Sequence, residues 1–258
     1  MRIAALSALS LVLFFSIASA APEIRYEGSS TVGLFMKDAA KVYKKAFFDI
    51  SVLTESNGGE ICVLAKTCAI GGVAREIDPL FSRRGLVAIP FAYDVLTAIV
   101  NSENNVKELT SRQVGDIFSG KIKNWKEVGG EDIPIKVYIV GKESATYDVF
   151  KTHILKDAQY SPDAETVRPD WRTVLMVTVE KGGIAQISRA FAASTDQVRP
   201  LIIDGHNPKN YKPNYPLSRL LYLTTFGPPQ GDVKEFIEWA TSGKAEALLK
   251  KRFIPLNQ

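Results

Sequence analysis

Residues 24–47, IRYEGSSTVGLFMKDAAKVYKKAF, run from a short predicted strand through a glycine- and serine-rich turn into a predicted amphipathic helix. Residues 24–27 form the strand, and apolar side chains then recur at helical spacing on one face. The apolar residues of that face are Val32, Phe35, Met36, Ala39, Ala40, Tyr43 and Phe47. This passage from strand to helix is the first of several along the chain and indicates an α/β fold.

The turn Gly28-Ser29-Ser30-Thr31 has two counterparts further along the chain. They are Ser56-Asn57-Gly58-Gly59 and Lys142-Glu143-Ser144-Ala145-Thr146, each at a similar junction. A helix N-terminus leaves backbone N–H groups unpaired and carries partial positive charge, so it favours a small anion. Each segment alone could be an ordinary N-cap, since Ser, Thr and Asn are preferred there. Three such segments together favour an oxyanion site.

The alternation continues to the end of the chain and predicts largely parallel sheets. We expect strands at residues 50–54, 69–73, 135–140, 198–203 and 217–225, and an apolar stretch at 86–100. We expect helices after Gly59, at 111–118, 145–155 and 173–180, and at 232–251 with a break at Ser242-Gly243. The Pro- and Asn-rich stretch 207–216 is expected to be a loop.

Residues 1–20 have the pattern of a secretory signal peptide, with Arg2, an apolar run at 9–17 and the small residues Ala18-Ser19-Ala20. We therefore expect export to the periplasm as a chain of about 238 residues that starts at Ala21. The apolar run is too short to span a bilayer, and no cysteine follows the cleavage site to carry a lipid anchor.

The charge and cysteine content exclude several classes of protein. Only Arg2 of the 32 Lys and Arg lies in the leader, so 31 remain against 28 Asp and Glu. The Lys and Arg residues are scattered along the chain, so nucleic-acid binding is not indicated. Cys62 and Cys68 are the only cysteines. In an oxidising compartment we favour a disulfide between them over two free thiols. No His or second Cys pair supports a metal or redox site.

Several longer blocks carry a family resemblance. The strongest is LTSRQVGDIFSGKIKNWKEVGG at residues 109–130, and others are YEGSSTV at 26–32, AIGGVARE at 69–76, IDG at 203–205, YPLSR at 215–219 and FIPL at 253–256. In sequence order these blocks resemble the substrate-binding proteins of phosphate ABC transporters, a family of two-lobed periplasmic binding proteins. The resemblance implies a type II periplasmic-binding-protein fold with mixed, mostly parallel sheets flanked by helices and a ligand cleft between lobes.

The lobes expected from this resemblance are formed by separate parts of the chain. Residues 21–94 and 200–258 would form the first lobe, and residues 95–199 the second. Because anion-type segments occur in both halves and no Pro/Gly-rich linker separates them, the chain should cross between lobes more than once. Clefts between lobes are where small ligands tend to bind.

The resemblance also implies a set of ligand-binding residues. They are Ser30, Thr31, Val32, Asn57, Gly58, Arg75, Lys142, Ser144, Ala145 and Thr146. Lys142 stands where the family's ligand arginine usually stands, and Ala74 stands where a serine precedes Arg75. Lysine is a point charge rather than a planar fork, so Lys142 would grip an oxyanion differently.

Carboxylates near these positions bear on specificity. Glu60 occupies a position where glycine is common, and it could interact with the helix dipole or accept a proton from a protonated oxyanion. Glu76 or Glu143 could equally be that acceptor. Such an acceptor would favour phosphate over sulfate, because a buried acceptor facing a ligand without a proton repels it.

The leading hypothesis is an oxyanion-binding protein, with phosphate as the expected ligand, that acts as a monomer without cofactor or metal and delivers its ligand to an ABC permease. An enzyme such as a hydrolase is the main alternative class. Only His153 and His206 are available to it, and neither lies in a nucleophile or metal-ligand spacing. A third hypothesis, motivated by Glu60, Ala74 and Lys142, is a sensor or accessory protein with an altered or lost ligand.

Overall fold

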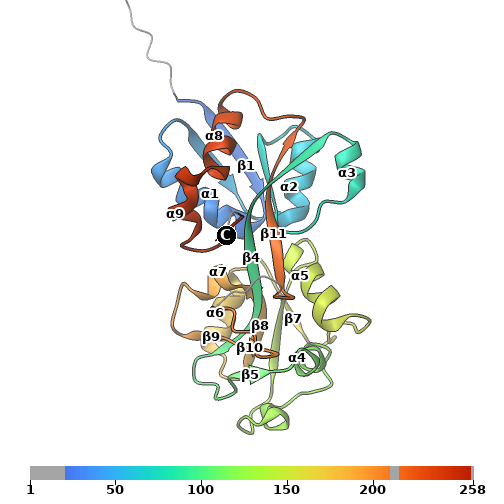
Figure 1. The fold of residues 1–258 in the computed structure, drawn as a ribbon. Helices are drawn as coiled ribbons and strands as arrows, with labels where there is room; N and C mark the ends of the chain where they lie inside the picture. The colour runs from blue at the N-terminus through green and yellow to red at the C-terminus, as the bar shows by residue number, and fades with distance from the viewer. Residues whose placement is uncertain (1–20, 210–214, 257–258) are drawn as a thin grey trace, which may run out of the picture.

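Two lobes joined by two long strands make up the computed structural model, which describes residues 21–209 and 215–256 (Figure 1). The joining strands are β4 (Leu86–Asn101) and β11 (Ser218–Phe226), which run side by side through the middle of the molecule. The predicted signal peptide lies outside the described residues. The expected two-lobed α/β architecture is confirmed.

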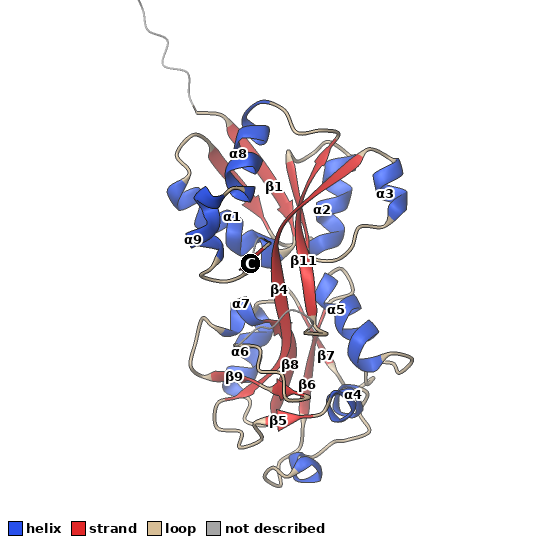
Figure 2. Cartoon of the chain, viewed as in Figure 1, coloured by secondary structure: helices blue, strands red, loops and turns tan. Residues whose placement is uncertain are grey.

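The first lobe is built on strands in the order β2 (Phe47–Ser51), β1 (Glu23–Gly28), β3 (Ile70–Val73), β11 and β4. β1 is parallel to both β2 and β3, whereas β11 is antiparallel to β3 and β4. Helices α1 (Ser30–Val42), α8 (Gly231–Thr241) and α9 (Glu246–Leu249) lie on one side of this sheet, and α2 (Glu55–Leu64) and α3 (Pro79–Arg83) lie on the other (Figure 2). A 3₁₀ turn (Gly243–Ala245) and β12 (Ile254–Pro255) complete the lobe.

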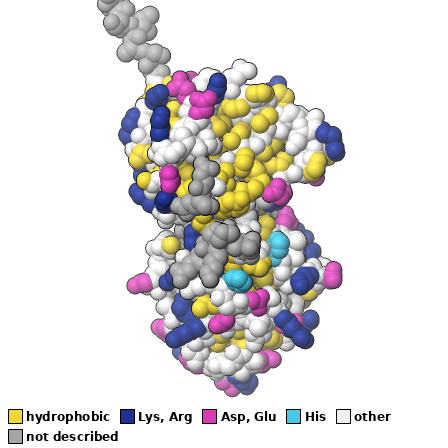
Figure 3. Space-filling view, viewed as in Figure 1, with side chains coloured by type: hydrophobic (Ala, Val, Ile, Leu, Met, Phe, Trp, Pro, Cys, Tyr) yellow, Lys and Arg dark blue, Asp and Glu magenta, His cyan; other side chains and the backbone are white. Residues whose placement is uncertain are grey.

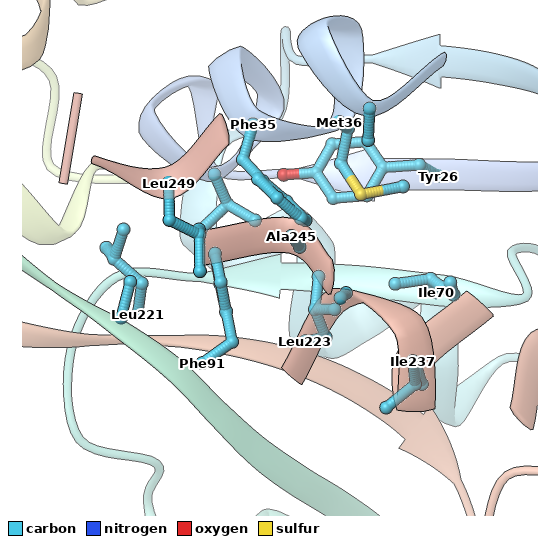
Figure 4. Packing of buried hydrophobic residues seen from close by; sticks show 14 of the residues in the cluster. Tyr26, Phe35, Met36, Ile70, Phe91, Leu221, Leu223, Ile237, Ala245 and Leu249 are labelled. Carbon is cyan, nitrogen blue, oxygen red and sulfur yellow. The ribbon is translucent and has the colours of Figure 1, made fainter. Parts of the chain in front are cut away.

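The larger core of the first lobe lies between the sheet and α1, α8 and α9 (Figure 4). Tyr26 and Ile70 from neighbouring strands are fully buried there, as are Phe35 and Met36 of α1. Burial of large apolar side chains contributes roughly 1.5–3 kcal/mol each. The predicted helical face is therefore the face that fixes α1, and with it the loop at the start of α1, to the sheet.

The second lobe is built on β4, β8 (Gly183–Ser188), β6 (Lys136–Val140) and β7 (Glu165–Val167), with β9 (Val198–Pro200) also paired to β4. A separate pair joins β5 (Glu108–Leu109) to β10 (Ile202–Ile203). The helices are α4 (Ser111–Phe118), α5 (Ala145–Phe150), α6 (Arg172–Val179) and α7 (Arg189–Ala192). A π-helical turn (Lys151–Leu155) follows α5, and a 3₁₀ turn (Trp125–Val128) follows α4.

Some boundaries differ from those expected. Residues 201–203 and 215–217 pack with the second lobe, since Leu201, Ile203, Tyr215 and Leu217 are buried in its core and β10 pairs with β5. The chain thus returns to the first lobe along β11, later than residue 200. The sheet is mixed rather than largely parallel, because β4 and β11 run antiparallel to their neighbours.

Two further differences concern the first lobe. Phe47 starts β2 instead of closing the apolar face of α1, and its side chain is 67% exposed. Helix α2 begins at Glu55, before the glycines at which it was expected to begin. Cys62 near the end of α2 and Cys68 in the following turn form a disulfide, with Cα atoms 5.4 Å apart.

Charged side chains of both signs are intermingled over the second lobe on the face shown in Figure 3, whereas hydrophobic side chains gather over the first lobe. Within the described part of the chain, no helix combines the length and apolar character needed to cross a bilayer.

Candidate functional site

The guanidinium group of Arg219 joins the two lobes at the cleft. Arg219 lies near the start of β11, and its side chain is almost fully buried. One terminal nitrogen donates to Thr31 Oγ1 of the first lobe at 3.1 Å, and the other donates to Thr146 Oγ1 of the second lobe, also at 3.1 Å. Because both threonine oxygens accept from Arg219, the hydroxyl hydrogens remain available to other acceptors.

Asp94 of β4 holds this guanidinium in place. Arg219 Nε lies 3.0 Å and Nη2 2.9 Å from Asp94 Oδ2, and Ser188 Oγ donates to Asp94 Oδ1 at 2.6 Å. Asp94 is 1% exposed. Two guanidinium nitrogens contact the same carboxylate oxygen, and this pair of contacts fixes the orientation of the guanidinium, which a flexible lysine would not provide.

The loop at the start of α1 follows from its glycine and serines. Gly28 has φ 137°, and a Cβ there would lie 2.5 Å from the Gly72 carbonyl oxygen, so the close approach of β1 to β3 requires glycine. Ser29 caps the helix and donates its backbone N–H to Gly72 at 2.9 Å. The next residue, Ser30, is the first residue of α1 and is buried. Its backbone N–H donates to Glu55 Oε2 at 2.8 Å, whereas Ser30 Oγ is buried without a hydrogen-bond partner.

The corresponding loop of the second lobe places Ser144 at the start of α5. Its hydroxyl accepts the Thr146 backbone N–H at 3.2 Å and donates to Asp170 Oδ2 at 2.5 Å. Asp170 is 2% exposed and precedes α6. We refer to Ser30, Thr31, Ser144, Thr146 and Arg219 as the interlobe cluster.

Two buried acids, Glu55 and Asp170, border the interlobe cluster from opposite lobes. Burial, and then repulsion from Asp170, raise the pKa of Glu55 from 4.5 to about 8. Burial also raises the pKa of Asp170, from 3.8 to about 6, although the hydrogen bond from Ser144 and the charge of Arg219 oppose the rise. Both carboxyl groups therefore hold protons more tightly than exposed acids do.

Arg75 lies at the edge of the cleft in an ion pair with Glu60. The two side chains make hydrogen bonds of 2.6 and 2.8 Å, and Arg75 also donates to Asn57 Oδ1 at 2.7 Å. Asp148 of the second lobe lies 3.7 Å from Arg75 Nε. The Glu60 carboxylate thus partners Arg75, which accounts for an acid at a position where the sequence resemblance leads one to expect glycine.

The structure brings together most of the residues expected at the site. Ser30, Thr31, Ser144 and Thr146 lie in the interlobe cluster, and Val32 and Ala145 are buried beside them. Asn57 contacts the second lobe through its N–H, which donates to the Glu143 carbonyl at 3.3 Å. Gly58, next to Asn57, lies against Thr54, whose Oγ1 would be 1.9 Å from a Cβ at that position.

The side chain of Lys142 is exposed, so the geometry does not place it in the position expected for the ligand arginine. The buried cation beside Thr31 and Thr146 is Arg219. The other candidate proton acceptors also have partners: Glu76 accepts the Tyr222 hydroxyl at 2.8 Å, and Glu143 pairs with Arg168.

Sequence reasoning assigned no role to Asp94, Arg219, Glu55 or Asp170. Asp94 could have been recognised from the sequence, because it interrupts an otherwise apolar run and a buried acid needs a partner. Arg219 could have been recognised in the same way, at the start of the apolar run LLYLTTF. Glu55 and Asp170 lie in polar stretches where burial cannot be read from the sequence.

The arrangement is suited to holding an oxyanion by hydrogen bonds. Hydroxyls from both lobes, a backbone N–H at the start of α1 and an oriented guanidinium are donors that oxyanions accept. In residues 21–209 and 215–256, no cluster of three potential metal ligands occurs.

Comparison with known proteins identifies the family. The sequence profile of the PBP superfamily domain matches residues 16–244. The chain belongs to the PBP superfamily.

Relatives of this PBP superfamily member include phosphate-binding proteins. Phosphate-binding protein PstS of Bacillus subtilis is 28% identical over 233 residues, covering 86% of this chain and 76% of the relative. Protein SphX of Synechococcus elongatus is 24% identical over 260 residues, covering 89% of this chain and 76% of the relative. These relatives agree with the resemblance read from the sequence.

Solved structures agree with the fold. A Clostridium perfringens protein, assigned as a phosphate ABC transporter substrate-binding protein and solved with bound phosphate, matches with a TM-score of 0.82 and 25% identity, covering 91% of this chain and 99% of its own. An ABC-type phosphate transport receptor from Vibrio cholerae matches with a TM-score of 0.70 and 24% identity, covering 90% and 99%. Both similarities extend over both lobes of this chain.

Proposed function

We propose that this PBP superfamily member is an exported solute-binding protein that captures inorganic phosphate between its lobes and delivers it to an ABC-transporter permease. The observation that carries the proposal is that Arg219 donates to a hydroxyl from each lobe, Thr31 and Thr146. The relatives named as phosphate-binding proteins supply the ligand class. The substrate-binding role explains the site without any covalent step.

The cluster would work through lobe closure. Thr31 belongs to the first lobe and Thr146 to the second, so both hydroxyls reach one anion only when the lobes approach each other. Hinge closure around a ligand is a common motion of two-lobed binding proteins. Ser30 and Thr31 would engage the anion from α1, while Arg219 contributes charge from the strand that joins the lobes.

Export to the periplasm, action as a monomer and delivery to a permease form part of the same proposal. A sensor or accessory role is the second candidate. It is favoured by Glu55 and Glu60, because one carboxylate accepts the Ser30 N–H and the other neutralises Arg75. Both reduce the positive potential available to an anion.

Calorimetric titration of the chain from Ala21, stripped of ligand by unfolding and refolding, tests the proposal. Phosphate, sulfate, molybdate and tungstate would be offered in turn, and we expect one-to-one binding of phosphate. Thr31→Ala and Thr146→Ala should each weaken phosphate binding by about 1.5–3 kcal/mol, the range for a hydrogen bond to a charged group.

Thr241→Ala is the matched control, since Thr241 Oγ1 donates to the Ile237 carbonyl on α8, outside the cleft. Its affinity should equal that of the wild type. Affinity unchanged in both cleft variants would rule out the interlobe cluster as the site. No binding of any of the four anions would favour the sensor or accessory role.

A further inference from the structure

Glu55 has an unusual place in the cleft. It is the first residue of α2, it has φ 52°, and it is 3% exposed. A positive φ is uncommon for a residue other than glycine and costs conformational energy, so the surrounding structure must hold it. Oε2 of its carboxylate accepts the Ser30 backbone N–H, and Oε1 is buried without a partner.

The donor that Glu55 uses is one that an oxyanion needs. The Ser30 N–H lies in the first turn of the 13-residue helix α1, where the N–H groups have no partners within the helix. The unpartnered Ser30 hydroxyl belongs to the same residue. An N–H makes one strong hydrogen bond, so a Glu55 carboxylate and a bound oxyanion compete for it.

The charges nearby add to this competition. Arg219 is paired with Asp94, and Arg75 is paired with Glu60. Neither cation is therefore left to balance an ionised Glu55 together with an incoming anion. In a site shielded from water, two negative groups that share one donor repel each other strongly.

We propose that Glu55 is a built-in competitor of the oxyanion: its carboxylate takes the ligand's place on the Ser30 N–H and must gain a proton or move aside before an anion binds there. This inference rests on the proposed function and adds to it a control of affinity. Glu55 thereby acts as a residue that lowers the affinity for the anion at high pH.

The direction of the pH effect follows from the groups that face Glu55. These are Tyr26 of β1 and Asp170 of the second lobe. The charge of Arg219 lowers the Asp170 pKa, and the charge of Glu143 raises it. Burial and Asp170 raise the Glu55 pKa, so Glu55 gains its proton as the pH falls through the neutral range. A protonated Glu55 accepts more weakly and does not repel the anion. Affinity therefore rises on acidification.

The test compares wild type, Glu55→Gln and Glu55→Gly. Glutamine keeps the shape and removes the charge, whereas glycine removes the side chain and tolerates the positive φ. Glu235→Gln is the control, because the Glu235 carboxylate pairs with Lys45 at 2.9 Å on the surface of α8. Phosphate affinity would be titrated at pH 6 and pH 8, and X-ray scattering of the stripped proteins would report lobe closure.

A pKa of about 8 leaves about half of the Glu55 carboxyls ionised at pH 8. We therefore expect both Glu55 variants to bind phosphate about twofold or more tighter than wild type at pH 8, with Glu235→Gln unchanged. Phosphate itself gains a proton in this range, so the decisive quantity is the difference in pH dependence between wild type and Glu55→Gln. A larger loss of affinity between pH 6 and pH 8 in the wild type supports the inference. Affinity in both variants equal to or below that of the wild type overturns it.

X-ray scattering distinguishes a failure of the Glu55 inference from a failure of the proposed phosphate capture. Glu55 lies close enough to Asp170 of the second lobe for that acid to raise its pKa, and its helix α2 contacts the second lobe where the Asn57 N–H donates to the Glu143 carbonyl. Loss of the Glu55 side chain can therefore change how closely the lobes approach. If no protein binds phosphate but Glu55→Gly opens the stripped molecule, the internal-ligand role of Glu55 stands and phosphate capture fails. If no protein binds phosphate and the molecule does not open, both fail.

Discussion

The two sides of the cleft use the same kinds of residue for different purposes. The first lobe supplies Ser30 and the buried Glu55, and the second supplies Ser144 and the buried Asp170. Asp170 accepts from the Ser144 hydroxyl and so lies behind its loop. Glu55 accepts from the Ser30 backbone N–H and so occupies a main-chain donor of its loop.

The difference shows that the atom an acid contacts determines its role more than its distance from the cleft. A carboxylate that accepts from a side-chain hydroxyl orients that side chain and leaves the backbone donors of the loop untouched. A carboxylate that accepts from the backbone N–H occupies the donor itself. Both acids have a raised pKa, yet we expect opposite effects on anion binding when each is neutralised.

The largest effect is expected at Arg219, the residue that the two sides share. Arg219→Met removes both threonine contacts, so phosphate affinity should fall by roughly a hundredfold or more, since hydrogen bonds to charged groups contribute about 1.5–3 kcal/mol each. It also leaves Asp94 buried without its cation, which should lower the free energy of unfolding by about 3–5 kcal/mol. Titration calorimetry and chemical denaturation measure the two losses.

The double variant Asp94→Asn/Arg219→Met separates these losses. Removing the orphaned charge should recover much of the stability and none of the affinity. Recovery of affinity in the double variant would mean that Arg219 acts on binding only by holding the fold.

An intermediate effect is expected on the pH dependence of stability. The Glu55 pKa is higher in the folded protein than its ordinary value of 4.5. As the pH rises above about 4.5, the unfolded chain releases this proton while the folded protein retains it, so the free energy of unfolding falls until about pH 8. The fall should exceed about 1.4 kcal/mol, the equivalent of one pKa unit.

Glu55→Gln should remove this decline, and Asp170→Asn should remove only the smaller part that lies at lower pH, because the Asp170 pKa is raised to about 6. Denaturant titrations at pH 5 and pH 8 give the comparison. A wild-type stability that increases over this interval would show that Glu55 is ionised in the folded protein throughout.

The smallest effect is expected at Lys142. Its side chain is exposed, and screened surface charges contribute about 1 kcal/mol or less. Lys142→Ala should therefore change phosphate affinity by about twofold or less, and Lys142→Arg should bring no gain. A tenfold loss in Lys142→Ala, measured by the same titration, would show that Lys142 reaches the anion after all.

Most helices and strands could be predicted from local sequence patterns, because these patterns depend on residues close in sequence. Helix α4 has the bounds 111–118 that its pattern predicted, and the loops that hold Ser30 and Ser144 were found from their hydroxyl and glycine content. The packing of Leu201 and Ile203 in the second lobe was not expected from the sequence, because Ile202 and Ile203 are held by pairing with β5, which is distant along the chain.

The centre of the site was beyond local patterns. Thr31 and Arg219 are 188 positions apart, and Asp94 and Arg219 are 125 apart. Only the folding of β11 against β4 brings these residues together. The resemblance led us to expect the cation of the site at Lys142, and Arg219 of the joining strand, which contacts Thr31 and Thr146, was not expected there. The position of Glu55 depends on a left-handed backbone conformation that a glutamate rarely adopts.

The strand β4 has a further consequence for the molecule as a whole. Phe91 and Ala92 of β4 are buried in the core of the first lobe, and Val95 and Leu96, three and four residues further on, are buried in the core of the second. Neither core is complete without the same continuous strand, so the loss of one lobe withdraws support from the other. The two largest hydrophobic clusters of the described residues therefore share one strand, and we expect the lobes to unfold together rather than one after the other.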